Sequence, residues 1–107
     1  MDVSDARIAS ARADWAAGER RLAAARQDPT RVATLDRLVD EIRRELVRRV
    51  GRTYSLAELV SAYEAAGPWT RDLAQRLAPG QAWAHDLSLI ADPVFAAAAR
   101  GARDWKP

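Results

Sequence analysis

His85 is the only histidine in the chain, so any reaction that needs an imidazole would depend on it. Acid–base catalysis and transition-metal binding both need a second positioned group beside the histidine. Asp86 is adjacent and would point to another side of a helix, and no Glu-x-x-His pair is present. A small enzyme would need a deep pocket that brings His85 to a carboxylate such as Glu58 or Glu64, which the spacing does not predict. We therefore assign His85 no function.

Carboxylates are the second group that could do chemistry, and three of them, Asp36, Asp40 and Glu41, lie close together. Each has arginines at helical neighbour distance: Asp40 is followed by Arg43 and Arg44, which is typical of a solvated, ion-paired helix face. Phosphate-binding glycine loops, dinucleotide motifs and a Gly-x-Ser-x-Gly turn are absent, and the chain has no cysteine. We therefore predict no catalytic residue, no bound metal and no cofactor.

Arginine supplies almost all of the positive charge: the chain has 16 arginines and a single lysine, and its net charge is +2. At 100° per residue Arg37, Arg44 and Arg48 share one side of a helix, and Arg52 follows the helix end. Nucleic acid would be contacted through such a ridge. Glu41 lies within the ridge, so a solvated, ion-paired face is the alternative interpretation, and we favour it.

The four tryptophans are the residues best able to anchor a core or a partner. Trp15, Trp69 and Trp83 occupy apolar positions at helical spacing, and we expect them in the core. Trp105 lies in a charged tail, where it either folds back onto the domain or stays free as an anchor for a partner protein. Docking of a chain end by one aromatic side chain favours the first alternative.

The first helix is predicted over 4–27 from a heptad pattern of alternating large and small side chains. Ile8, Trp15 and Leu22 are the large residues, with small residues such as Gly18 between them. Such a seam lets a second helix approach closely, so this helix needs a neighbour. The neighbour is either another helix of the chain or a second copy, which makes these three large residues a candidate self-association seam.

The second helix is predicted over 29–50, with Asp28 as its N-cap, Pro29 in its first turn and Gly51 at its end. Its apolar stripe follows helical spacing from Val32 to Val50. Because the connection is short, the first two helices are expected to form a long antiparallel hairpin.

Shorter helices are expected in the C-terminal half. Ser55 and Glu58 form a capping box, which predicts a helix start at Ser55. Asp92 and Pro93 interrupt the last apolar segment, either within one kinked helix or as the cap of a separate final helix, and we favour two helices. The predicted segments are helices over 55–66, 68–78, 81–91 and 93–100, followed by a tail over 102–107.

These patterns predict one all-α domain over 1–107, in which the long hairpin packs with three or four shorter helices. The N-terminus lacks the features of a secretory signal and no apolar segment approaches membrane length, so we expect a cytoplasmic protein without membrane insertion. The predicted function is a non-catalytic protein–protein interaction or accessory role, and homo-oligomerisation through the first helix is one form that it can take. The alternative is a nucleic-acid-associated protein that uses the arginine ridge.

Overall fold

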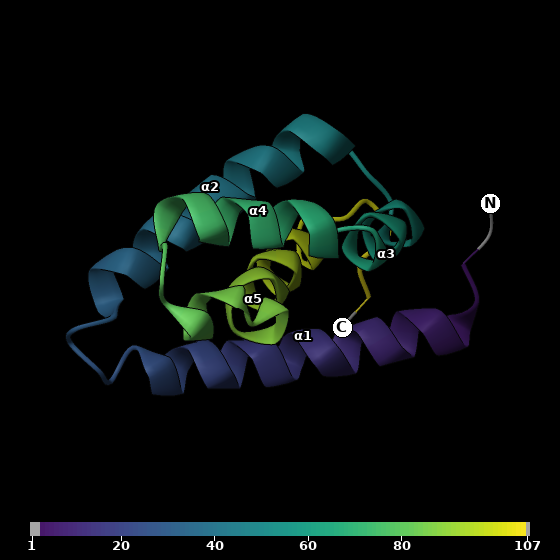
Figure 1. Cartoon of the computed structure of the whole chain (residues 1–107). Helices are drawn as coiled ribbons and strands as arrows, with labels where there is room; N and C mark the ends of the chain where they lie inside the picture. Colours follow the sequence, from purple (N-terminus) through teal and green to yellow (C-terminus); the bar gives the residue numbers. More distant parts are fainter. Residues whose placement is uncertain (1–2, 107) are drawn as a thin grey trace.

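The last helix of the chain, α5 (Leu87–Ala99), lies at the centre of the molecule, and the other helices pack around it (Figure 1). The computed structural model describes residues 3–106, and every regular element among them is helical. The predicted all-α fold class is therefore confirmed. In chain order the other elements are α1 (Asp5–Ala25), α2 (Val32–Val50), α3 (Leu56–Glu64), α4 (Gly67–Leu77) and the short 3-10 helix η1 (Ala82–His85).

α5 is central because nearly all of its side chains are apolar. Ser88 and Asp92 are its only polar residues, and every residue from Leu89 to Ala96 is buried. A helix that is apolar on all sides is stable only when its neighbours cover it. Its start is fixed locally by Asp86, whose carboxylate accepts the backbone N–H of Ser88 at 3.0 Å.

α1 crosses α5 at Gly18, where the two backbones come very close. A Cβ atom at Gly18 would lie 2.2 Å from the Cβ of Asp92 and 2.6 Å from the carbonyl oxygen of Ser88. Three residues earlier on α1, at the preceding position of the seam, Trp15 is only 2% exposed and stacks on Phe95. The neighbour that the alternating seam of α1 requires is thus α5 of the same chain.

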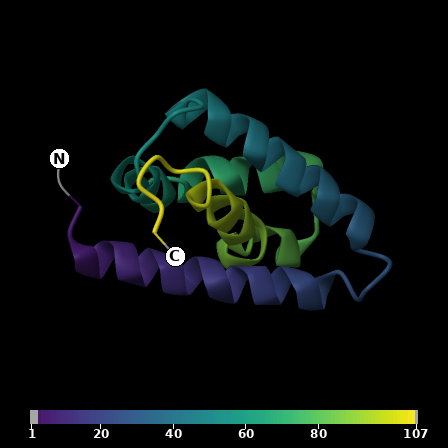
Figure 2. The same ribbon diagram turned by 180° about the vertical axis from the view of Figure 1, so that it is seen from behind.

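The predicted antiparallel hairpin of α1 and α2 is not confirmed as a closely packed pair. The two helices meet at the link over 26–31 and then diverge, and α5 lies between them (Figure 2). α1 packs mainly on α5, whereas α2 packs on α5, α4 and α3. An amphipathic helix buries more apolar surface against α5 than against a second amphipathic helix, which explains this arrangement.

The predicted helix start at Asp28 and Pro29 is three residues too early. The Asp28 carboxylate accepts the backbone N–H of Thr30 at 3.0 Å and its hydroxyl at 2.7 Å, which forms a turn. α2 begins at Val32, after an N-cap residue, Arg31, whose side chain makes no capping hydrogen bond. An aspartate can bind a backbone N–H in a turn as well as at a helix start, so the residue type alone does not distinguish them.

The predicted boundary at Asp92 and Pro93 is wrong, because Pro93 lies inside the continuous helix α5. The segments predicted over 81–91 and 93–100 are η1 followed by α5. An internal proline removes one backbone hydrogen bond and crowds the preceding turn. Here Pro93 is buried, and the apolar contacts of α5 with four surrounding helices offset that cost.

The capping box at the start of α3 is confirmed. The Ser55 hydroxyl accepts the Glu58 backbone N–H at 3.1 Å, and the Glu58 carboxylate accepts the Ser55 backbone N–H at 3.3 Å. The C-terminal tail joins this site, because the Asp104 carboxylate accepts the Leu56 backbone N–H at 2.7 Å. The tail therefore helps to hold α3 in place.

Of the three tryptophans expected in the core, only Trp15 is fully buried. Trp69 and Trp83 are half-buried: they pack against the core, and each ring is covered by an arginine. The guanidinium of Arg49 lies 5.0 Å from the centroid of Trp69, and that of Arg31 lies 5.3 Å from the centroid of Trp83. An indole can thus occupy an apolar stripe and still end at the surface, where it attracts a cation.

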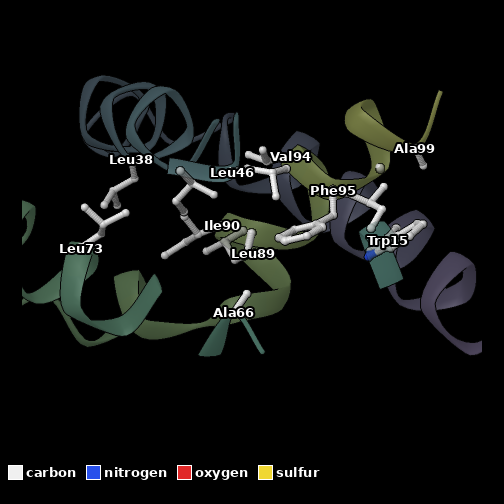
Figure 3. Close-up of a cluster of buried hydrophobic side chains, with 14 of the residues drawn as sticks. Trp15, Leu38, Leu46, Ala66, Leu73, Leu89, Ile90, Val94, Phe95 and Ala99 are labelled. Atoms are coloured by element: carbon white, nitrogen blue, oxygen red, sulfur yellow. The ribbon is translucent and has the colours of Figure 1, made fainter. Parts of the chain in front are cut away.

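The core is one hydrophobic cluster formed around α5 (Figure 3). Leu38 and Leu46 of α2 and Leu73 of α4 pack toward α5, which contributes Ile90 and Phe95. Among residues 3–106, no helix combines the length and the apolar character needed to cross a bilayer.

Candidate functional site

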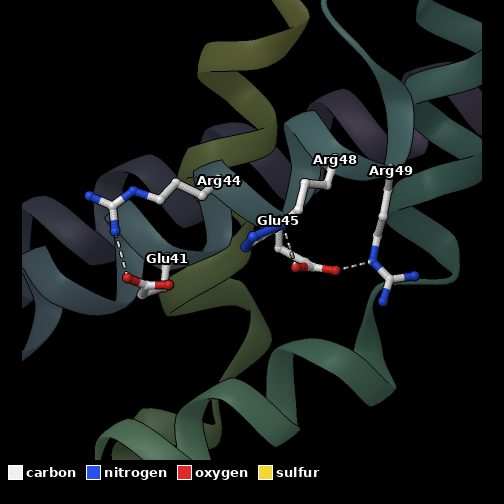
Figure 4. A network of polar contacts seen from close by, with 5 residues as sticks. All are labelled: Glu41, Arg44, Glu45, Arg48 and Arg49. Atoms are coloured by element: carbon white, nitrogen blue, oxygen red, sulfur yellow. Dashed lines mark hydrogen bonds and ion pairs between the residues drawn. The ribbon is translucent and has the colours of Figure 1, made fainter.

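The two central arginines of the predicted ridge, Arg44 and Arg48, are paired with carboxylates of α2 (Figure 4). Arg44 binds Glu41 at 2.5 Å, and Arg48 binds Glu45 at 3.1 Å. Glu45 also binds Arg49 at 3.0 Å, so one carboxylate serves two arginines. These pairs at i,i+3 and i,i+4 are the contacts typical of an ion-paired helix face.

The other two residues of the predicted ridge, Arg37 and Arg52, are exposed. Within residues 3–106 neither forms an ion pair. Arg37 lies in the first half of α2, and Arg52 lies beyond the end of the helix, 15 positions further along the chain. Two isolated cations at this separation do not form a continuous basic surface.

Trp105 folds back onto the domain, which is the first of the two alternatives predicted for it. It is half-buried and packs against the core, with the guanidinium of Arg12 4.6 Å from its ring centroid. Arg12 belongs to α1, so the tail closes over the first helix. Trp105 therefore serves its own fold, and it is not a free anchor in this structure.

The candidate self-association seam is divided between the core and the surface. Trp15 is buried against Phe95 of α5 and Tyr63 of α3. Its ring lies edge-on to that of Tyr63, with the two ring centroids 5.6 Å apart. Ile8 and Leu22 are only half-buried. The middle of the seam is thus occupied by α5, and only its two ends reach the surface.

Leu22 lines a hollow of the described surface, which we call the α5 groove. It has a volume of about 520 Å³ and is lined by residues of α1, α2 and α5. Its walls are Leu22 of α1 and Val39, Leu46 and Val47 of α2. Val47 is 43% exposed, and within the described chain it is the only large hydrophobic residue exposed to this degree.

The floor of the α5 groove consists of small side chains. Pro93 and Val94 are buried beneath it, Ala98 is half-buried and Ala97 is exposed. At Ala97 and Ala98 the other helices therefore leave part of α5 uncovered. An apolar, half-open hollow of this volume lies within the range of ligand and peptide-binding pockets.

A second unusual site is a carboxylate buried where α1 crosses α5. Asp92 is 1% exposed, and its Oδ1 has no hydrogen-bond partner among the described residues. Tyr63 of α3 lies beside it, and the Tyr63 hydroxyl donates a hydrogen bond of 3.3 Å to Asp14 of α1. A buried carboxylate without a paired cation strongly favours its neutral form.

The ionisation of this cluster is shifted accordingly. Burial raises the pKa of Asp92 from 3.8 to about 6, and the nearby carboxylates of Asp14 and Asp86 act in the same direction. The Tyr63 hydroxyl and Arg21 oppose this rise in the pKa of Asp92. Burial also raises the pKa of Tyr63 well above its ordinary value of 10, and the carboxylates of Asp92 and Asp14 raise it further.

The larger hollows of the described surface do not reach Asp92, so this carboxyl group is not presented to a substrate. His85 is exposed in η1, and its side chain makes no hydrogen bond or ion pair within residues 3–106. Glu58 and Glu64, the carboxylates considered as its partners, bind Arg103 and Arg7 instead. Within the described residues, neither of these carboxylates is paired with His85.

Sequence patterns did not predict the α5 groove or the buried Asp92. For the groove, the available signal was that the apolar stripe of α2 is wide and that Val47 extends it further. For Asp92, the signal was an acidic residue in the most apolar segment of the chain, between Ile90 and Val94. Both signals become specific only once the packing partner of each helix is known.

Comparison with protein-family models, with curated proteins and with solved structures gave no match to this chain. A functional assignment therefore depends on the geometry described above.

Proposed function

We propose that this chain is a non-catalytic interaction protein that binds a partner protein in the α5 groove. The single observation that carries the proposal is the uncovered side of α5. Ala97 is exposed and Val47 is 43% exposed beside it, whereas every residue of α5 from Leu89 to Ala96 is buried. Apolar surface that a fold leaves open in a concave site is a feature of binding surfaces.

The electrostatics of the surface agree with binding through apolar contact. The arginines and carboxylates of the described surface are mostly paired with one another, so charge does not dominate it. The nucleic-acid alternative would depend on the ridge at Arg37, Arg44, Arg48 and Arg52, in which the two central arginines already have partners. This leaves the groove as the better-supported contact surface.

The proposal is tested by filling the groove. Ala97→Trp places an indole on the floor of the groove, and Ala13→Trp makes the same change at an exposed position of α1 that does not line the groove. Tagged wild-type and variant proteins are recovered from native lysate after nuclease treatment, and the affinity of each recovered protein is measured with purified components. We expect a partner that binds the wild type and Ala13→Trp and binds Ala97→Trp at least about tenfold more weakly.

Partners that bind all three proteins equally would contradict the groove as the contact surface. Loss of every partner on nuclease treatment would instead favour nucleic-acid association through the arginine ridge. Circular dichroism and thermal unfolding establish that both tryptophan variants remain folded.

A further inference from the structure

α1 is attached to the rest of the molecule by few large side chains. It lies along one side of the molecule and is joined to α2 through the 26–31 link (Figure 1). Its buried residues are Ala11, Trp15 and Gly18, of which only Trp15 has a large side chain. The largest fully buried apolar side chains of the described chain belong to α2, α3 and α5. These helices would therefore retain most of the hydrophobic core if α1 moved away from them.

Two ion pairs that join α1 to other segments lie at the surface. Arg7 pairs with Glu64 of α3, and Glu19 pairs with Arg100 at 2.8 Å. All four side chains are at least 38% exposed, and exposed ion pairs contribute little to stability. The packing of α1 on α5 is therefore the main contact that holds α1 in place.

The crossing of α1 and α5 contains the buried carboxylate of Asp92. Asp92 meets the backbone of α1 at Gly18, where an added Cβ atom would lie 2.2 Å from the Cβ of Asp92. Asp92 Oδ1 has no hydrogen-bond partner among the described residues, and the Tyr63 hydroxyl beside Asp92 donates to Asp14. An ionised Asp92 would leave a negative charge in this crossing without the cation and hydrogen bonds that a buried charge needs.

The charged groups around Asp92 do not supply that cation. Asp14 of α1 and Asp86 at the start of α5 are carboxylates. Arg21 of α1 is the cation of this set, but it already binds Asp86 and donates to the Ser88 hydroxyl at 2.5 Å. Within residues 3–106, α2, α4 and η1 add no charged group to the set. Water is then the best source of stabilisation for the charge, and water reaches this 1% exposed side chain only if α1 moves away.

We propose that loss of the Asp92 proton releases α1 from α5, while α2, α3, α4 and α5 remain packed on one another. The crossing thus acts as a proton-controlled latch. Because Leu22 of α1 lines the α5 groove, release also removes one side of that groove. The latch does not depend on whether the groove binds a partner.

Hydrogen exchange followed by mass spectrometry tests the latch on the full chain at pH 5.0 and pH 7.5. The protection of each helix is corrected for the pH dependence of the intrinsic exchange rate. The pKa of Asp92 is about 6 when the side chain is buried and 3.8 ordinarily, so the released state should become up to about tenfold more populated over this interval. We expect the protection of α1 to fall by that factor and the protection of α2 to change by less than about twofold.

Two variants assign the effect to Asp92. Asp92→Asn cannot ionise, so we expect the protection of its α1 helix to be the same at both pH values. Asp72→Asn, at an exposed position of α4, is the matched control and is expected to behave like the wild type.

A second measurement does not require Asp92→Asn to fold. The chain has no cysteine, so Ala11→Cys and Ala74→Cys each place a single thiol at a buried position, the first on α1 and the second on α4. Labelling rates with a dithiopyridine are divided by those of the same variant unfolded in urea at the same pH. We expect the corrected rate to rise by up to about tenfold from pH 5.0 to pH 7.5 for Ala11→Cys and by less than about twofold for Ala74→Cys.

Three results would overturn the latch. Equal loss of protection in α1 and α2 would show that ionised Asp92 destabilises the whole fold. Protection of α1 that is independent of pH would show that ionisation does not release the helix. A pH dependence that persists in Asp92→Asn would assign the release to another group.

Discussion

Asp92 is the residue at which the fold departs most from ordinary packing. Its carboxyl group is buried next to Gly18, it lacks a cation, and the Tyr63 hydroxyl beside it is shared with Asp14. The folded protein therefore retains a proton that an unfolded chain releases. Because the pKa of Asp92 is about 6 in the folded protein and 3.8 ordinarily, the folded state binds the extra proton in the interval between these values.

This difference predicts the sign of a pH effect. Stability contributed by protonated Asp92 is present at low pH and is lost as the pH rises from about 4 to about 6, by up to about 3 kcal/mol. We expect Asp92→Asn, which cannot ionise, to lack this loss and to be more stable than the wild type at pH 7.5.

Urea denaturation at pH 4.5 and pH 7.5 measures this effect, with exposed Asp72→Asn as the control. If the stability difference between wild type and Asp92→Asn is the same at both pH values, Asp92 is already ionised in the folded protein and the prediction is wrong.

At the scale of elements, the crossing of α1 and α5 determines how the helices fit together. Gly18 is unfavourable in a helix by about 1 kcal/mol relative to alanine. It is retained at a point where the Cβ of Asp92 and the carbonyl of Ser88 leave no space for a side chain. Close approach of the two backbones offsets the weak helix propensity at this position.

Gly18→Ala is therefore expected to destabilise the protein by about 1–3 kcal/mol, although alanine is the better helix former. Ala13→Gly, at an exposed position of the same helix, measures the effect of propensity alone and is expected to cost about 1 kcal/mol. Both values come from denaturant unfolding. Stabilisation by Gly18→Ala would show that the α1–α5 crossing is looser than described.

At the scale of the whole molecule, the five α-helices enclose one hydrophobic core, and the α5 groove, which we propose as a partner site, remains open. The heptad seam of α1 resembled a dimer interface in the sequence, yet Trp15 stacks on Phe95 within the same chain. Replacing Trp15 should therefore damage the fold and leave the oligomeric state unchanged.

Trp15→Ala is expected to lower the free energy of unfolding by about 3–5 kcal/mol, the usual cost of removing a buried aromatic side chain. Light scattering over a range of concentrations compares its molar mass with that of the wild type, and Trp69→Ala serves as a half-buried control. A wild-type dimer that Trp15→Ala converts to a monomer would restore self-association through the seam.

Local features of the fold could be predicted from the sequence because each depends on residues within one or two turns. The capping box at Ser55, the end of α2 before Gly51 and the ion pair of Asp40 with Arg43 are examples. Gly51 has a φ of 79°, a backbone conformation that glycine adopts easily. Asp28 and Asp92 were assigned wrongly because an aspartate next to a proline fits a turn or a helix interior as well as a cap.

The amino-acid sequence by itself determined that this chain forms amphipathic helices and where most of them end, since those features depend on local hydrogen bonds and on the period of the apolar residues. Only the tertiary structure decided that α5 lies between α1 and α2, that Asp92 is buried and that the α5 groove remains open. The physical reason is that apolar burial is nondirectional: a stripe specifies that a helix must be covered, and the sum of many weak contacts between distant segments decides what covers it.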